Sequence, residues 1–447
     1  MTLFSIFKII KTNYFSFLLA LLPISFIAGN MIININAMLL VFSALIFFKK
    51  NVFKIKYFFI DKIILLFFFF ILFNGIYADI KLYIYHNEFY ETRNFVTSIK
   101  SILYFRYFLL YLVLRFLVET NKIKLNLFFI TCSLSSIFVC FDIFYQFTYG
   151  KDIFGFPVET TGRKFSGPFG DELIAGGYVQ RFSLFSFFIL PIFFPKYSNR
   201  FSKYLIPILF SIFVIGLTLS GNRMPTILFI FIILLITVLQ KQIRKFLIPF
   251  FLIFSVIFVV IYKSNDVVRF NFLGFYEQVV KISVSIKNKN FTDKHNPQHL
   301  KEFVTFYDTW LLNKYVGGGI KNFRYYCHVR PNNSIEYPDK KSKFICNMHP
   351  HNYYLEILTE TGLVGFALIL IIFFTAFSLT FVKKYFFASP LNQNNLIIPF
   401  IFLFIAEIFP IKSTGSFFTT GNTTYLFLIL GILIALTRGK YSIENKV

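Results

Sequence analysis

The chain has 447 residues, 56% of them hydrophobic, and a mean hydropathy of +0.66. This composition excludes a soluble globular protein, because apolar runs of roughly 20 residues, long enough to cross a bilayer, recur along most of the chain. The net charge of +24, from 45 basic and 21 acidic residues, would suggest nucleic acid binding in a soluble chain. Here the basic residues lie mostly between apolar runs, so we expect them to orient a membrane protein, with no nucleic acid partner.

The apolar runs predict an all-α polytopic integral membrane protein with about 12 transmembrane helices. Another span follows the first almost at once, so we expect no cleaved signal peptide. The expected spans cover approximately residues 12–29, 31–48, 57–77, 97–117, 126–147, 177–195, 204–219, 225–239, 247–262, 361–382, 395–411 and 421–437. With both termini in the cytoplasm, this count brings the basic clusters to the cytoplasmic side, at residues 49–56, 122–124, 196–203, 241–245, 383–384 and 438–440.

The chain therefore divides into three parts. Residues 1–262 hold the first nine spans and a polar loop at 149–176. Residues 263–350 form a large polar insert between the ninth and tenth spans, and residues 351–447 hold the last three spans. On this topology the polar loop, the insert and the turn at Arg223 all emerge on the non-cytoplasmic face, so their chemistry can converge there.

Charged residues surround the sixth span. Asp171 and Glu172 precede it, either as helix N-terminal charges or as part of a substrate loop. Arg181 lies about one turn into the span, where it either snorkels to the interface or binds a substrate. Farther along, Arg223 lies in the short turn between the seventh and eighth spans, where it either snorkels to the interface or binds phosphate. The second interpretation is favoured, because the backbone donors of the Ser-Gly-Asn turn beside a guanidinium suit phosphate oxygens.

The insert carries an amphipathic pattern and two cysteines. The apolar positions predict a helix that covers the site or lies on the membrane, and it ends before Gly317-Gly318-Gly319. Cys327 and Cys346 are expected to form a disulfide if the insert faces an oxidising compartment, and the alternative is zinc binding together with His328 and His349. Cys132 and Cys140 lie inside a span and are expected to be packing residues.

The stretch from His349 to Gly365 brings imidazoles, an amide and carboxylates to the mouth of a span. A histidine with a pKa near neutrality suits a general base, so His351 is the candidate and His349 its rival. Glu360 or Glu172 would orient the imidazole or the acceptor. The alternative is structural: His351 and Asn352 would cap the helix, and Gly362 would allow close packing.

The spacing His351-Asn352, nine residues, then Gly362-x-x-Gly365 resembles the signature of the O-antigen ligase and polymerase superfamily. Two further segments are similar to elements of these proteins: Arg163 to Tyr178, with its glycine one place later than in the family pattern, and Gly317 to Phe323.

The resemblance implies a GT-C-like, metal-independent inverting glycosyltransferase of the bacterial inner membrane, without a cofactor and with its active site facing the periplasm. It implies an undecaprenyl-pyrophosphate-linked glycan as donor and a lipid A-core or glycan hydroxyl as acceptor. Arg223, Arg163 and Arg181 would bind the diphosphate, while Asp171, Glu172 and Asn352 would belong to the substrate or acceptor loop.

Several functions remain open from the sequence. Ligase and polymerase share the donor and differ in the acceptor, and transfer to protein also occurs in the superfamily. A transporter of lipid-linked sugars would carry charges near the bilayer midplane and broken-helix repeats, whereas this chain concentrates its polar residues at one face. A purely structural or sensory membrane protein is a further alternative.

Overall fold

The computed structural model describes residues 3–85, 95–159, 164–240, 266–291, 296–330, 346, 352–386, 395–412 and 415–438, with single positions between 244 and 263. Arg163, His349, His351 and most of the expected ninth span lie outside these residues. Within them, every element is helical apart from one isolated β-bridge between Lys151 and Pro157.

Seven of the described helical segments are long and apolar enough to cross a membrane. They contain α2 (Asn30–Phe48), α3 (Phe59–Tyr85), α5 (Val96–Tyr104) with α6 (Arg106–Glu119), α7 (Asn126–Tyr149), α10 (Pro195–Leu219), α17 (Tyr353–Phe377) and α19 (Thr420–Arg438). Shorter apolar helical stretches accompany them, namely Thr12–Ala28 within α1 (Leu3–Ala28), α11 (Arg223–Leu239) and α18 (Ile398–Glu407). The predicted all-α polytopic fold is confirmed, and the number of twelve spans stays a prediction.

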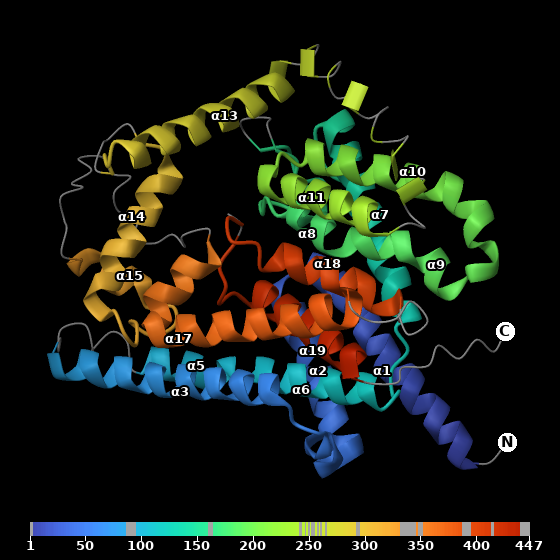
Figure 1. Ribbon diagram of the computed structural model, residues 1–447, viewed down its shortest axis with the longest axis horizontal. Coiled ribbons are helices and arrows are strands. Elements are labelled where there is room, and N and C mark those ends of the chain that lie inside the picture. The colour runs from blue at the N-terminus through green and yellow to red at the C-terminus, as the bar shows by residue number, and fades with distance from the viewer. Residues whose placement is uncertain are drawn as a thin grey trace.

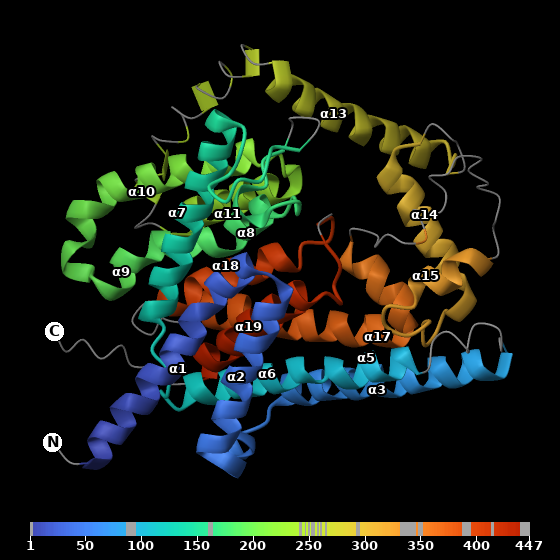
Figure 2. The same cartoon turned by 180° about the vertical axis from the view of Figure 1, so that it is seen from behind.

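Helix α19 lies in the middle of the bundle and packs along α6, with α1, α2 and α18 around it (Figures 1 and 2). It is buried over almost its whole length, and Gly431 permits the close approach: a Cβ there would lie 3.0 Å from the carbonyl oxygen of Tyr111. A buried ion pair at one end joins α6 to α3, because Arg115 of α6 contacts Asp61 of α3 and also donates to Glu119 of its own helix at 2.7 Å. Arg438, at the end of α19, stacks 3.9 Å from the centre of the Phe58 ring at this same end.

The expected sixth span is not one continuous helix. The chain forms the short helix α8 (Ala175–Phe182), a 3-10 turn η3 (Ser183–Phe188) and α9 (Ile189–Phe193), and then turns back into α10. Residues 182–188 of this stretch are buried, so its apolar character reflects packing inside the protein. The break places Arg181 at the end of a short helix within the bundle.

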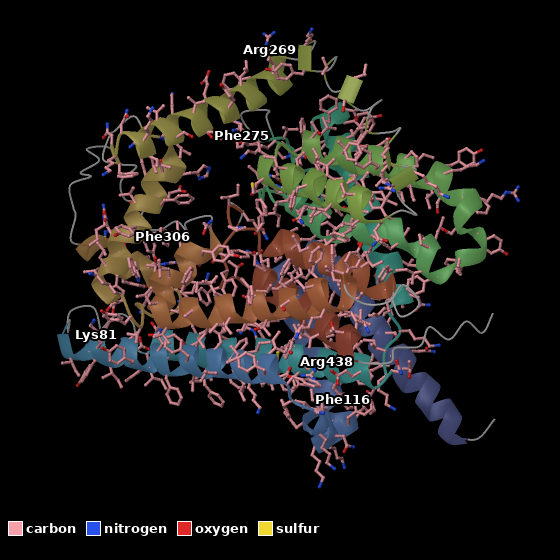
Figure 3. All side chains as sticks on the ribbon, in the orientation of Figure 1. Lys81, Phe116, Arg269, Phe275, Phe306 and Arg438 are labelled. Carbon is pink, nitrogen blue, oxygen red and sulfur yellow. A yellow bond between two sulfur atoms is a disulfide. The ribbon has the colours of Figure 1, made fainter. Side chains whose placement is uncertain are left out.

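The polar insert forms an arm on one side of the bundle, built from α13 (Asp266–Lys287), α14 (Gln298–Trp310) and α15 (Phe323–Tyr326) (Figure 1). The predicted amphipathic helix corresponds to α14, whose Leu300 and Phe306 are buried while Tyr307 is half exposed. Figure 3 shows Phe275 of α13 and Phe306 of α14 on this arm, far from Phe116 and Arg438 at the other end of the bundle.

Helix α17 is broken at Gly362, and the insert fills the break. Gly362 has φ 63° and ψ −168°, a backbone conformation that is accessible essentially to glycine alone. The amides of Leu363 and Val364 donate to the carbonyl oxygens of Lys314 and Tyr315 at 2.9 and 3.0 Å. In return, the amides of Gly318 and Gly319 donate to the carbonyl oxygens of residues 359 and 360 at 3.2 and 2.9 Å. The insert therefore completes the hydrogen bonding of a membrane helix.

Candidate active site

A cavity of about 1300 Å³ lies between α8, the start of α11, the start of α2, the arm and the loop that joins α18 to α19. Three residues predicted for the site line it: Arg181, Arg223 and Glu172. The cavity also exposes charged or titratable side chains that we did not select from the sequence, namely Glu159, Lys164, His299 and Lys412. Segments from five separate parts of the chain thus meet around one polar space.

Arg181 is held by residues that follow it by more than 170 positions. Its Nη2 donates to Glu407 Oε1 at 2.9 Å and to Asn422 Oδ1 at 2.7 Å, and its guanidinium lies 4.8 Å from the centre of the Tyr425 ring. Nη2 also lies 3.2 Å from the hydroxyl of Tyr353, the first residue of α17. This network fixes the guanidinium at the cavity wall, so the binding geometry is set before any ligand arrives.

Lys412 adds a second cation beside the first. Its Nζ lies 2.7 Å from Glu407 Oε2 and 4.7 Å from the centre of the Tyr353 ring, so one carboxylate serves two cations. Burial lowers the pKa of Lys412 to about 8, opposed by Glu407 and assisted by the charge of Arg181. Two cations against one carboxylate leave this wall with a net positive charge, which favours an anionic ligand.

Arg223 begins α11 at another wall of the cavity. The preceding turn is fixed to the start of α8, because Asn222 Oδ1 accepts from the amide of Gly176 at 2.9 Å and Asn222 Nδ2 donates to the carbonyl of Leu173 at 3.1 Å. Helix α13 passes over the guanidinium: a Cβ on Gly274 would lie 3.9 Å from Arg223 Nη2. An arginine at a helix N-terminus combines a fixed charge with the helix dipole, and both favour phosphate.

The motif helix starts beside the same loop. Asn352 caps α17, since its Oδ1 accepts from the amides of Tyr354 and Leu355 at 3.0 and 3.1 Å. Its Nδ2 donates to the carbonyl of Pro410 at 3.0 Å, two residues before Lys412. Asn352 therefore has a capping role, as one of the two interpretations of the sequence predicted, and it also ties the start of α17 to the loop that carries Lys412.

The acidic residues predicted for the site are separated. Glu172 is exposed and lines the cavity, whereas Asp171 is exposed and is not among the lining residues. Glu360 is 3% exposed and does not line the cavity either. Nearby, Glu356 accepts hydrogen bonds of 2.5 Å from the Ser416 hydroxyl and from the amide of Phe417. Of the three predicted carboxylates, Glu172 is the one that the structure brings to the cavity.

His299 is a residue that we missed in the sequence. It lies in the first turn of α14, its side chain is 47% exposed, and it lines the cavity from the arm. Its Nδ1 lies 3.3 Å from Glu302 Oε2, and that carboxylate is only 1% exposed. Gln298 Nε2 donates to the other carboxylate oxygen at 3.4 Å. A buried carboxylate behind an exposed imidazole orients the ring, as in many proton-transfer sites.

The arm has its own small core. Cys327 and Cys346 are joined by a disulfide across 19 residues, and they pack with Phe306 and Phe323, whose rings stack 3.5 Å apart. The Thr359 hydroxyl of α17 donates to the carbonyl of Phe306 at 3.2 Å. The disulfide thereby supports α14, and α14 carries His299.

Comparison with known proteins identifies part of this architecture. Residues 208–370 match the family model of the O-antigen ligase, and no curated protein matches the chain. The match begins within α10 and ends within the second half of α17, so it contains Arg223 and the His349–Gly365 stretch but not Arg181, Glu407 or Lys412. Residues 208–370 are therefore similar to the O-antigen ligase family, and the resemblance to the O-antigen ligase superfamily that the sequence motifs indicated is confirmed over this region.

Proposed function

We propose that the chain is a membrane glycosyltransferase that moves a glycan from undecaprenyl pyrophosphate to a hydroxyl of lipid A-core, on the periplasmic face of the bacterial inner membrane. One observation carries the proposal: Arg181, Lys412 and Arg223 line one cavity inside a membrane bundle, and that cavity also contains an imidazole. Ionisable groups are costly in such a bundle and generally serve a substrate or ion there.

The proposed reaction is a single displacement. The acceptor oxygen forms a bond to the anomeric carbon, the bond from that carbon to the diphosphate oxygen breaks, and the acceptor proton passes to a histidine. The diphosphate leaves with the electron pair of the broken bond. Arg181, Arg223 and Lys412 stabilise its growing charge, with Arg163 of the polar loop as a further ligand. In this proposal the cationic side chains neutralise the negative charge that develops on the leaving diphosphate.

His351 is our proposed base, with His349 as its rival. The support is its position next to Asn352, which is hydrogen-bonded to Pro410 close to Lys412. His299 is a third imidazole, and it lines the cavity from the arm, with the carboxylate of Glu302 beside its ring. We propose that His299 contacts the acceptor and that Glu172 belongs to the same acceptor side.

Glycan profiling of a deletion strain tests the proposal. We expect long glycan to accumulate unligated on its lipid carrier, and restoration by the wild-type chain but not by an Arg181→Gln variant. Accumulation of single repeats instead would identify a polymerase with the same donor. Lipid-linked sugar retained on the inner leaflet would identify a transporter and overturn the enzymatic proposal.

A further inference from the structure

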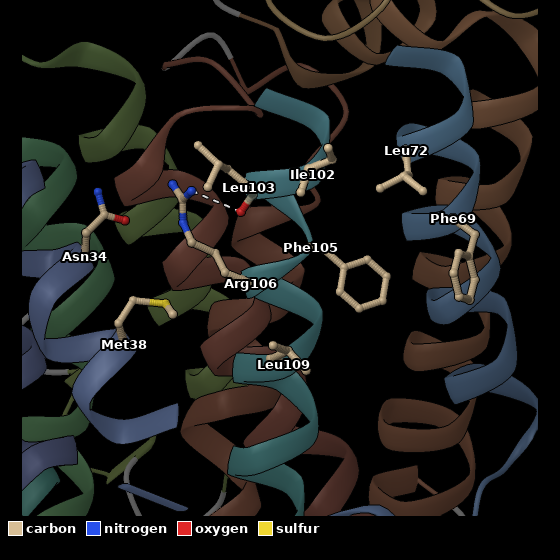
Figure 4. Close-up of a pocket in the computed structure, with 9 residues that line it drawn as sticks. All are labelled: Asn34, Met38, Phe69, Leu72, Ile102, Leu103, Phe105, Arg106 and Leu109. Carbon is tan, nitrogen blue, oxygen red and sulfur yellow. Dashed lines mark hydrogen bonds between the residues drawn. The ribbon is translucent and has the colours of Figure 1, made fainter. Parts of the chain in front are cut away.

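A second cavity, of about 650 Å³, opens on the apolar surface of the bundle between α2, α3 and the junction of α5 with α6 (Figure 4). Met38 of α2 and Leu109 of α6 line it together with Phe69 and Leu72 of α3. Phe69 is 42% exposed although it lies within a membrane-length helix. The groove therefore opens toward the hydrocarbon of a bilayer, and its volume lies in the usual range for ligand sites, about 300–1,000 Å³.

Helix α2 connects this groove to the active-site cavity. Asn30 lines the polar cavity, whereas Asn34 and Met38 line the apolar groove. These three residues follow each other at intervals of four, so they form one row on a single face of the helix. At 1.5 Å per residue the row covers about 12 Å along the helix axis. One helix face thus leads from the cationic site into the apolar groove.

Arg106 is the charged residue among those that line the groove. Its Nη1 donates to the carbonyl of Leu103 at 3.0 Å, its Nη2 donates to the Tyr107 hydroxyl at 2.8 Å, and its guanidinium lies 4.6 Å from the centre of the Tyr107 ring. Two of the three guanidinium nitrogens are therefore bonded to its own helical turn. The remaining lining, apart from Asn34, is apolar and suits a hydrocarbon chain.

We propose that this groove binds the isoprenoid chain of the lipid-linked donor while its diphosphate occupies the cavity at Arg181 and Arg223. The inference rests on the proposed function, because it needs a donor with an anionic head and a long apolar tail. The tail would leave the cavity at Asn30, follow the α2 row past Asn34 and lie against Met38 and Leu109. Such a groove selects the length of the tail and fixes the direction in which the donor enters.

A kinetic test uses the purified full-length protein and two donors that carry the same glycan diphosphate on a long or a short isoprenoid chain. Met38→Trp and Leu109→Trp fill the groove. We expect each to raise KM for the long-chain donor about tenfold, equivalent to about 1.4 kcal/mol, with little change for the short-chain donor. Ile46→Trp is the control, since Ile46 continues the same α2 row, is 71% exposed and lies outside the groove. If both variants keep the wild-type preference for chain length, the inference is overturned.

A labelling test separates this inference from the proposed function. A long-chain isoprenyl diphosphate without glycan, with a diazirine on its tail, is photolysed with the wild-type protein. Labelling of the peptides that contain residues 34–38 and 102–109, lost in Met38→Trp, supports the groove even if the protein transfers no glycan at all. Labelling elsewhere on the bundle, or equal competition by ordinary phospholipid, excludes a donor-specific groove.

Discussion

Arg181 and Glu407 are separated by 226 positions in the sequence, yet their side chains form an ion pair of 2.9 Å inside the bundle. Glu407 also pairs with Lys412 at 2.7 Å and accepts a hydrogen bond from the Tyr353 hydroxyl at 2.7 Å. The carboxylate therefore joins α8, α18, the loop after α18 and the start of α17. The stability of the bundle and the position of its cations depend on the same group.

Glu407→Gln tests this double role. The change leaves two neighbouring cations without their counter-charge, and breaking a buried pair in this way costs about 3–5 kcal/mol. We expect a lower thermal midpoint for the purified protein together with a loss of glycan transfer. Glu277→Gln, on the exposed side of α13, should leave both unchanged. An unchanged midpoint in Glu407→Gln would show that Glu407 is not the anchor of the network.

Arg223→Lys tests whether the guanidinium binds phosphate in a bidentate manner. Lysine keeps the charge but loses the planar pair of donors, so we expect kcat to fall on the order of 100-fold. The matched control is Arg269→Lys, because Arg269 lies on the helix that covers the site but is exposed. Full activity of Arg223→Lys would remove Arg223 from the diphosphate site.

The lowered pKa of the Lys412 ammonium leads to a prediction of how activity depends on pH. Its pKa is lowered from 10.5 to about 8 by burial, so the side chain is charged below that pH and neutral above it. If its charge holds the diphosphate, kcat/KM for the donor declines as the pH rises through about 8. Lys412→Arg keeps the charge, and we expect it to shift this decline to higher pH. Lys164→Arg, at another part of the cavity, should retain the wild-type profile, and the same profile in Lys412→Arg would contradict this assignment.

Substitution can distinguish the proposed base His351 from the imidazole of His299 on the arm. We expect His351→Asn to lower kcat by about 100-fold to 10,000-fold, the usual contribution of a general base. His299→Asn should raise KM for the acceptor more than it lowers kcat, and Glu302→Gln should reproduce this effect more weakly. His328→Asn is the control, because His328 is an exposed residue of the arm that does not line the cavity. The reverse order, with the larger kcat loss in His299→Asn, would transfer the role of base to His299.

Gly362→Ala tests the break in α17. The residue has φ 63°, and a Cβ there would overlap with the carbonyl of Tyr315. We expect a loss of stability on the order of 2 kcal/mol or more, measured by thermal unfolding. Gly177→Ala is the comparison, since it lies in a helix and a Cβ there meets nothing within 4 Å. Equal midpoints for the two variants would show that the break is not required.

The sequence was informative where a residue is unusual for its surroundings. Arg181 drew attention because a charge inside an apolar run is rare, and the structure places it at the cavity. The same argument applies to Glu407 and Lys412, which end the next-to-last apolar run, and it would have identified them. Hydropathy also predicted the membrane helices, because length and apolar character are local properties of the chain.

Other features depend on contacts that no local pattern contains. The expected span at 177–195 is divided by a 3-10 turn. Hydropathy does not reveal this division, because packing inside the protein and burial in the membrane require the same apolar residues. His299 looked like the polar side of an amphipathic helix, and only the fold brings it to the cavity that Arg181 also lines. The sequence predicted Gly362 as a residue for close packing, but the break in the helix is created by a segment almost 50 positions earlier.

That exchange of backbone hydrogen bonds at Gly362 has a consequence for engineering. An arm transplanted from another protein of similar architecture would have to supply the complementary carbonyls and amides of residues 314–319, otherwise the recipient helix would retain unsatisfied peptide groups within lipid. Chimeric proteins should therefore exchange residues 314–319 and 359–364 as one cassette. The arm and the helix that it completes behave as a single structural unit.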